Sequence, residues 1–128
     1  MNKWMLSVVG IALMGIMAKL PAEDSPSVPK ICYMVISAQQ ECNENYIDWA
    51  NKHAPTAVPP LMDLRSKWQG MRDNLPDAVH RYGVGEMKKA CEGPMRKGAF
   101  DQQGKNAATI AAAGGDASRC QKALKTIQ

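Results

Sequence analysis

Residues 59–76 read PPLMDLRSKWQGMRDNLP and give the clearest indication of fold class in this chain. Apolar side chains recur there at alternating steps of three and four residues, the period of one face of an α-helix. They are Leu61, Leu64, Trp68, Met71 and Leu75. Pro59 and Pro60 suit the first helical turn, where a proline loses no needed hydrogen bond, and Pro76 ends the pattern. The stretch predicts an amphipathic helix that packs its apolar stripe against another helix.

The segment before this stretch also has a helical period. Residues 31–36 are apolar and rich in β-branched side chains, which taken alone also fits a strand. The apolar pattern continues at helical spacing, however, through Cys42, Tyr46, Trp49 and His53. We therefore expect one helix that begins near residue 31 and stops before Pro55.

The segment after it predicts a third helix. Asp77 is a suitable N-cap, and one face then carries Val84, Met87 and Cys91. Gly83 and Gly85 weaken the middle, so a kink or a close helix contact is expected there. Gly93-Pro94 is predicted to end this helix.

The helical signal fades between residues 95 and 115, where glycines interrupt the pattern and only 107–113 suggests a short helix. A last helix, capped by Asp116 or Ser118, is expected to carry Cys120 and Leu124. No alternating strand pattern follows residue 36. The sequence thus predicts an all-α protein, a small bundle of three to four helices.

The N-terminus has the features of a signal peptide. Lys3 precedes an apolar run over residues 5–17, which is short for a membrane span, and Leu20-Pro21-Ala22 is a plausible cleavage site. We expect a signal peptide over residues 1–22, a loose polar lead over 23–30 and one helical domain over 31–128. If the segment is not cleaved, it anchors the chain to a membrane instead. The predicted location is the periplasm or outside the cell.

The four cysteines are expected to form two disulfides, because an exported chain enters an oxidising compartment. They are Cys32, Cys42, Cys91 and Cys120. Ten helical residues span about 15 Å, which is too far for a bridge from Cys32 to Cys42. Two pairings remain open: 32–91 with 42–120, or 32–120 with 42–91. The cysteines lack the close spacing of zinc ligands, and no C-x-x-C redox motif occurs.

Basic residues concentrate in the second half of the chain. From residue 79 onward nine bases face four acids, whereas residues 23–78 carry eight acids and five bases. Among the bases, Lys88, Lys89, Arg96 and Lys97 are the predicted binding residues, for an acidic partner or an anionic surface. The net charge of the mature chain, +2 after the loss of Lys3 and Lys19 from a total of +4, is too small to indicate nucleic-acid binding.

No catalytic set is evident in the sequence. His53 and His80 are the only side chains with an ordinary pKa near neutrality, and neither stands beside a recognisable nucleophile motif. We therefore expect no catalytic residue, no cofactor and no metal site. The predicted function is binding of a protein partner, as an inhibitor, an immunity-type protein or an accessory factor of the cell envelope. The alternative is a small periplasmic metal-binding protein or a hydrolase that uses His53 or His80; the oligomeric state stays open.

Overall fold

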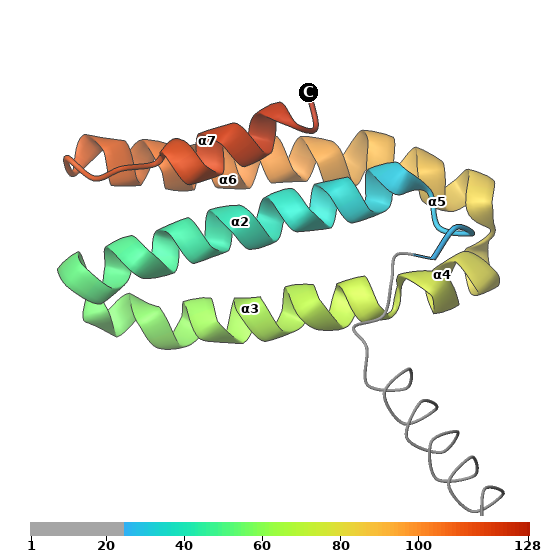
Figure 1. Cartoon of the computed structure of the whole chain (residues 1–128), viewed down its shortest axis with the longest axis horizontal. Helices are drawn as coiled ribbons and strands as arrows, with labels where there is room; N and C mark the ends of the chain where they lie inside the picture. The colour runs from blue at the N-terminus through green and yellow to red at the C-terminus, as the bar shows by residue number, and fades with distance from the viewer. Residues whose placement is uncertain (1–24) are drawn as a thin grey trace, which may run out of the picture.

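The computed structural model describes residues 25–128, and every regular element in this range is helical (Figure 1). The elements are α2 (Lys30–His53), the short 3-10 helix η1 (Pro55–Ala57), α3 (Val58–Asp73), α4 (Leu75–Tyr82), α5 (Val84–Ala90), the π-helical turn η2 (Cys91–Met95), α6 (Arg96–Ala112) and α7 (Ser118–Lys125). The all-α prediction is confirmed. The predicted signal peptide over 1–22 and the first two residues of the lead lie outside the described residues.

Helix α2 is the centre of the molecule. It contacts α3 on one side and α6 and α7 on the other (Figure 1). Because neighbours cover it on two sides, its buried residues include polar as well as apolar side chains, among them Gln39, Asn43 and Asn45. Lys52 and His53 stand in its last turn, where cations interact favourably with the helix dipole.

Part of the predicted lead packs on α2 instead of being loose. Val28 is buried, and the backbone N–H of Ser25 donates a hydrogen bond to the Tyr33 hydroxyl at 2.9 Å. These contacts hold the chain against α2 before the helix begins at Lys30.

The prediction that the whole 59–76 stripe packs against another helix is wrong in its middle. Leu61 and Leu75 are buried, but Leu64 is 38% exposed and Met71 is 43% exposed. The reason is that α3 turns polar side chains toward α2. The side-chain amide of Asn43 donates to the Leu61 backbone carbonyl at 3.0 Å. Further along α3, the side chains of Arg65, Gln69 and Arg72 make hydrogen bonds to side chains of α2. The apolar stripe is thereby displaced from the contact.

The predicted third helix is divided and is capped differently. The helix α3 ends at Asp73, Pro76 lies in the first turn of α4, and Asn74 rather than Asp77 occupies the N-cap position. Asp77 lies inside the first turn, where its charge is favourable. Gly83 separates α4 from α5 with φ +87°, a conformation that glycine adopts without a steric penalty. Instead of one kinked helix, the structure therefore has two separate helices, α4 and α5.

The prediction that Gly93-Pro94 ends a helix is also wrong. Pro94 lies inside η2, and the chain continues through this π turn into α6. A proline clashes with the carbonyl four residues earlier, and the wider π turn is a known way to relieve such a local conflict. Instead of a short helix over 107–113, α6 then runs from Arg96 to Ala112. Tertiary packing of its buried side chains outweighs its weak local propensity.

Helix α6 ends in a glycine motif that places the loop to α7. Gly114 has φ +77°, its N–H donates to the Ala111 carbonyl at 3.0 Å, and the Gly115 N–H donates to the Ile110 carbonyl at 2.8 Å. This is the hydrogen-bond pattern of a Schellman cap. Asp116 then accepts a hydrogen bond from the Ser118 N–H at 2.9 Å, close to the start of α7.

Both disulfides start from α2 and end in the second half of the chain. Cys32 bonds to Cys91 and Cys42 bonds to Cys120, with Cα–Cα distances of 5.1 and 4.1 Å. Of the two pairings that the sequence left open, the structure has the first. Four cysteines joined in this way are consistent with an oxidising compartment outside the cytoplasm.

Gly115 has no room for a side chain. A Cβ added there would lie 2.7 Å from Cδ1 of Trp49 and 2.8 Å from Cγ2 of Ile110. We expect Gly115→Ala to lower the free energy of unfolding by about 1–3 kcal/mol, the usual cost of overpacking. Urea denaturation measures this change. Gly104→Ala is the matched control, because nothing lies within 4 Å of its Cβ position; it should leave stability unchanged or raise it by up to about 1 kcal/mol.

Candidate functional site

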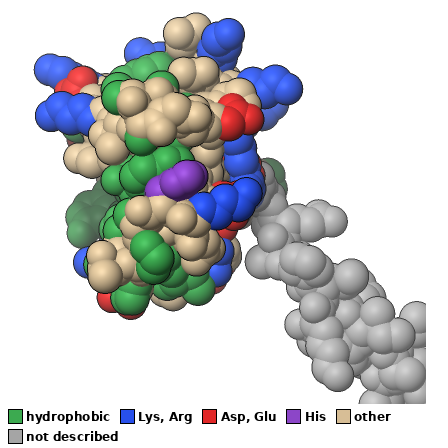
Figure 2. Space-filling view, turned by 90° about the vertical axis from the view of Figure 1, so that its left-hand side faces the viewer, with side chains coloured by type: hydrophobic (Ala, Val, Ile, Leu, Met, Phe, Trp, Pro, Cys, Tyr) green, Lys and Arg blue, Asp and Glu red, His purple; other side chains and the backbone are tan. Residues whose placement is uncertain are grey.

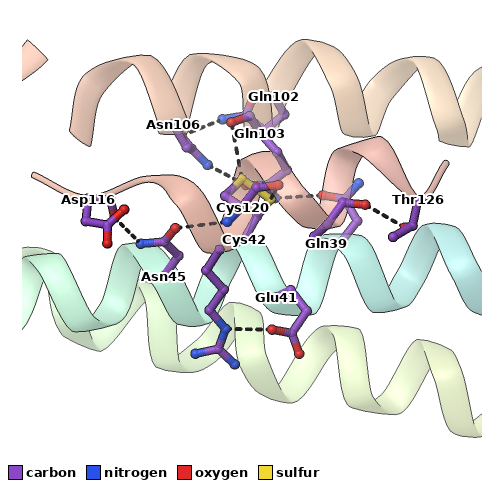
Figure 3. Close-up of a disulfide and its surroundings, with 12 residues drawn as sticks. Gln39, Glu41, Cys42, Asn45, Gln102, Gln103, Asn106, Asp116, Cys120 and Thr126 are labelled. Atoms are coloured by element: carbon purple, nitrogen blue, oxygen red, sulfur yellow. Dashed lines mark hydrogen bonds and ion pairs between the residues drawn. A yellow bond between two sulfur atoms is a disulfide. The ribbon is translucent and has the colours of Figure 1, made fainter. Parts of the chain in front are cut away.

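Helices α6 and α7 form one layer that is fixed to α2 by buried polar contacts around the second disulfide (Figure 3). The side-chain amide of Asn45 donates to the Asp116 carbonyl at 2.9 Å, and its oxygen accepts from the Cys120 N–H at 3.0 Å. Nearby, the Gln103 amide donates to the Gln39 side-chain oxygen at 2.6 Å. These bonds satisfy buried polar groups and fix the position of the layer.

One cation of this layer is used for the same attachment. Arg119 donates to a carboxylate oxygen of Glu41 at 2.6 Å, and its guanidinium lies 3.7 Å from a carboxylate oxygen of Asp48. The hydrogen bond and the charges of these acids raise the pKa of Arg119 above its ordinary value. Arg119 therefore belongs to the contact between α7 and α2.

The net positive charge of the described residues lies in this layer. Residues 25–95 contain eight acids and eight bases and are neutral, whereas residues 96–128 contain six bases and two acids, a net charge of +4. In Figure 2 most of the Lys and Arg side chains stand out from the upper part of the molecule, where α6 and α7 lie. The uneven distribution of charge along the chain is thus also a difference in net charge between the α6 and α7 layer and the rest of the described molecule.

Five cations of the layer make no ion pair with any residue from 25 to 128. They are Arg96, Lys97, Lys105, Lys122 and Lys125. The four lysines are exposed, because the buried side of each helix is directed at α2. We call these five residues the basic layer. Cations that are neither paired nor buried are available to an acidic partner.

The four predicted binding residues divide into two pairs. Lys88 lies 3.9 Å from Glu92 and Lys89 lies 3.8 Å from Glu86, so each faces an acid no more than four residues away along the chain. Arg96 and Lys97 instead line an open hollow of about 560 Å³ that also includes Phe100 and Gln128. The structure thus brings Arg96 and Lys97 together, and it gives Lys88 and Lys89 local acidic neighbours.

Sequence spacing carries a signal for this division. Glu92 stands four residues after Lys88 and Glu86 three residues before Lys89, the separations at which helical side chains meet. By contrast, no acid stands within four residues of Lys122 on either side. What spacing alone did not reveal is that α6 and α7 lie side by side, which joins their lysines into one layer.

The histidines are not brought together. His53 ends α2, and its ring lies 5.6 Å from the Trp49 ring, beside a hollow of about 300 Å³ that also includes Asp48 and Ser118. His80 is exposed on α4. Within residues 25–128 neither histidine makes a hydrogen bond, and no group of three or more His, Cys, Asp or Glu side chains has the arrangement of a metal site. The hollow thus places Asp48, His53 and Ser118 along one lining, without a hydrogen bond from His53 to either of the others.

A surface ion pair joins α2 to α3 and makes stability depend on pH. Arg65 donates two hydrogen bonds to the Glu44 carboxylate, at 2.5 and 2.6 Å, and these hold the pKa of Glu44 below its ordinary value of 4.5. The pair stabilises the fold above that ordinary value, and the stabilisation is lost as the pH falls through the lowered pKa of the folded state.

We expect Glu44→Gln to lower the melting temperature near neutral pH and to have progressively less effect on acidification. Thermal melts of both proteins between about pH 7 and pH 3 would measure this, because the neutral amide cannot titrate. A difference that stays constant over this range would contradict the assignment of the pH dependence to Glu44.

None of the helices that the structure describes is both long and apolar enough to cross a membrane. Comparison with family models, with curated proteins and with solved structures found no match to this chain, so its function has to be argued from its own residues.

Proposed function

We propose that this chain is a small exported binding protein that uses the basic layer of α6 and α7 to bind an acidic protein partner in the cell envelope. The observation that carries this proposal is the +4 charge of residues 96–128 beside a neutral remainder. Five cations of two adjacent helices make no ion pair within residues 25–128, and the four lysines among them are exposed. Complementary charge guides and selects protein partners.

The attachment of the layer supports the same proposal. A binding surface loses less conformational entropy on association when its elements are already fixed. The disulfide from Cys42 to Cys120, the hydrogen bonds of Asn45 and the Arg119 ion pairs fix α7 on α2. An inhibitor, an immunity-type protein or an envelope accessory factor would each benefit from such a rigid charged surface.

Charge reversal tests this function, and a smaller charge reversal on α5 serves as the control. The test variant carries Glu at positions 97, 105, 122 and 125, and the control carries Glu at positions 88 and 89, whose lysines already face acids. We expect capture of a partner from envelope extract of the native host to fall at least roughly tenfold for the test variant and much less for the control. Capture by the unchanged protein should weaken as salt is added, because salt screens exposed charges.

Three outcomes would refute the proposal. Equal capture by the test variant would exclude the basic layer, and equal loss in the control would show a general effect of charge. Binding to vesicles of anionic lipid without a protein partner would assign the layer to a membrane surface instead. A second variant tests the alternative function. Replacing His53 and His80 with Gln should leave capture of the partner unchanged. If this variant folds but no longer captures the partner, the alternative of a hydrolase or metal-binding protein is favoured.

A further inference from the structure

Within residues 25–128, no element covers the apolar stripe of α3. Leu64, Trp68 and Met71 lie on one side of the helix, and α3 makes its main contacts with α2, η1 and α4 among the described elements. Leu64 and Met71 are exposed, and Trp68 is half-buried. Exposed apolar side chains at steps of four and three residues are the pattern by which one helix recognises another.

The contact between α3 and α2 explains why the stripe faces outward. Arg65 bonds to Glu44, and the Gln40 amide donates to the side-chain oxygen of Gln69 at 3.4 Å. Arg72 donates to the Ser37 hydroxyl at 2.8 Å on the same side of α3. These polar contacts fix the rotation of α3, so the stripe cannot turn inward without breaking them.

The charges of the molecule favour a second copy of this chain on the stripe. Residues 30–73, which span α2 and α3, carry five acids and five bases, whereas α6 and α7 carry the net charge. Two copies repel each other if they meet at the basic layer, but they meet without net repulsion at α3. Helix α3 lies on the opposite side of α2 from α6 and α7 (Figure 1).

The edge of the stripe is also complementary to itself. Asp63 and Lys67 stand one helical turn apart along this edge, and neither makes an ion pair within residues 25–128. When two α3 helices pack antiparallel about a two-fold axis that crosses the stripe at the level of residue 65, Asp63 of each copy meets Lys67 of the other. In the same register Leu64 of one copy lies between Leu64 and Trp68 of the other, so the apolar side chains interdigitate.

We propose that α3 is a self-association surface on which two copies of the chain form an antiparallel, two-fold dimer. The stripe is short, so the dimer is expected to be weak, with a dissociation constant on the order of 10–100 μM. In this dimer the two basic layers face away from each other, so it presents two sites for an acidic partner. The self-association itself does not depend on the proposed function.

Sedimentation equilibrium of the purified, disulfide-bonded protein tests the proposal. We expect the mass to approach twice that of the monomer as the concentration rises from about 5 μM to about 1 mM. Leu64→Gln and Met71→Gln should each weaken the dimer roughly tenfold, because the two-fold axis counts each change twice. Met62→Gln is the matched control: Met62 is 40% exposed but lies on the other side of the same helix.

A charge swap tests the register. Lys67→Asp should weaken the dimer, and the double variant D63K/K67D should restore it, since each new lysine again meets an acid. All these positions are exposed, so circular dichroism should show unchanged folding. A monomer at every concentration would overturn the proposal and leave the stripe to another partner. Equal weakening by Met62→Gln, or a swap that fails to restore association, would overturn it as well.

Discussion

Replacing Cys42 and Cys120 together with alanine is expected to lower the free energy of unfolding by about 4–5 kcal/mol. The two residues are 78 positions apart, and the chain-entropy model gives this value for a loop of that length. A domain of this size has a net stability of only about 5–15 kcal/mol. The loss is therefore a large part of the total, and chemical denaturation of the oxidised double variant would measure it.

The effect should also be local. Helix α7 has only eight residues, too few to be stable in isolation, and the bridge holds it on α2. Hydrogen exchange should show that α7 loses protection first in this variant. Replacing Cys32 and Cys91 is the matched control: its cost is similar, about 4 kcal/mol, but α7 should then stay protected. A cost below about 1 kcal/mol for the first variant would contradict the prediction.

Asn45→Ala is expected to cost about 2–4 kcal/mol, because it leaves two backbone groups without a partner. The Asp116 carbonyl and the Cys120 N–H both bond to this side chain, which is only 6% exposed. A buried group left unpaired costs about 1–3 kcal/mol. Urea denaturation at constant pH would measure the loss.

Two variants make the Asn45 prediction specific. Asn51→Ala, on the exposed side of the same helix, should change stability by less than about 0.5 kcal/mol. Asn45→Asp keeps the acceptor for the Cys120 N–H but turns an oxygen toward the Asp116 carbonyl, so it should be destabilised too. If Asn45→Ala resembled Asn51→Ala, the link between α2 and α7 would not depend on these bonds.

The sequence predicted what depends on local pattern. The helical period before Pro55 placed α2 correctly, and the distance between Cys32 and Cys42 along a helix excluded their pairing. The sequence could not choose between the two cross-pairings, because the choice depends on which part of α2 faces η2 and which faces α7. That is a property of the packed molecule.

The errors lie where packing outweighs a local preference. Pro94 and the glycines of α6 argue against a long helix, yet the packing of Ala99 and Ile110 against α2 holds it together. The prediction that the whole 59–76 stripe is buried was wrong for a different reason. A regular apolar period shows that a helix has an apolar side, but polar partners such as Glu44 decide whether that side meets the core.

The candidate site, too, was predictable where it depends on local sequence and not where it depends on packing. Counting charges along the chain identified the basic half, and spacing to Glu92 and Glu86 contained the signal that Lys88 and Lys89 are locally paired. Only the antiparallel placement of α6 and α7 could show that Lys122 and Lys125 join Lys97 in one layer. Contacts between distant segments of the chain are what one sequence encodes least directly.

The arrangement of the two cross-links has a consequence for survival among proteases. Any single cut of the backbone between Cys42 and Cys91, a span that includes all of α3, α4 and α5, falls inside both loops. The two fragments would then remain joined at both bridges, and a cut after α2 ends at His53 would leave α2, α6 and α7 intact and assembled. A molecule nicked there would travel as a single species in electrophoresis until a reducing agent released its pieces.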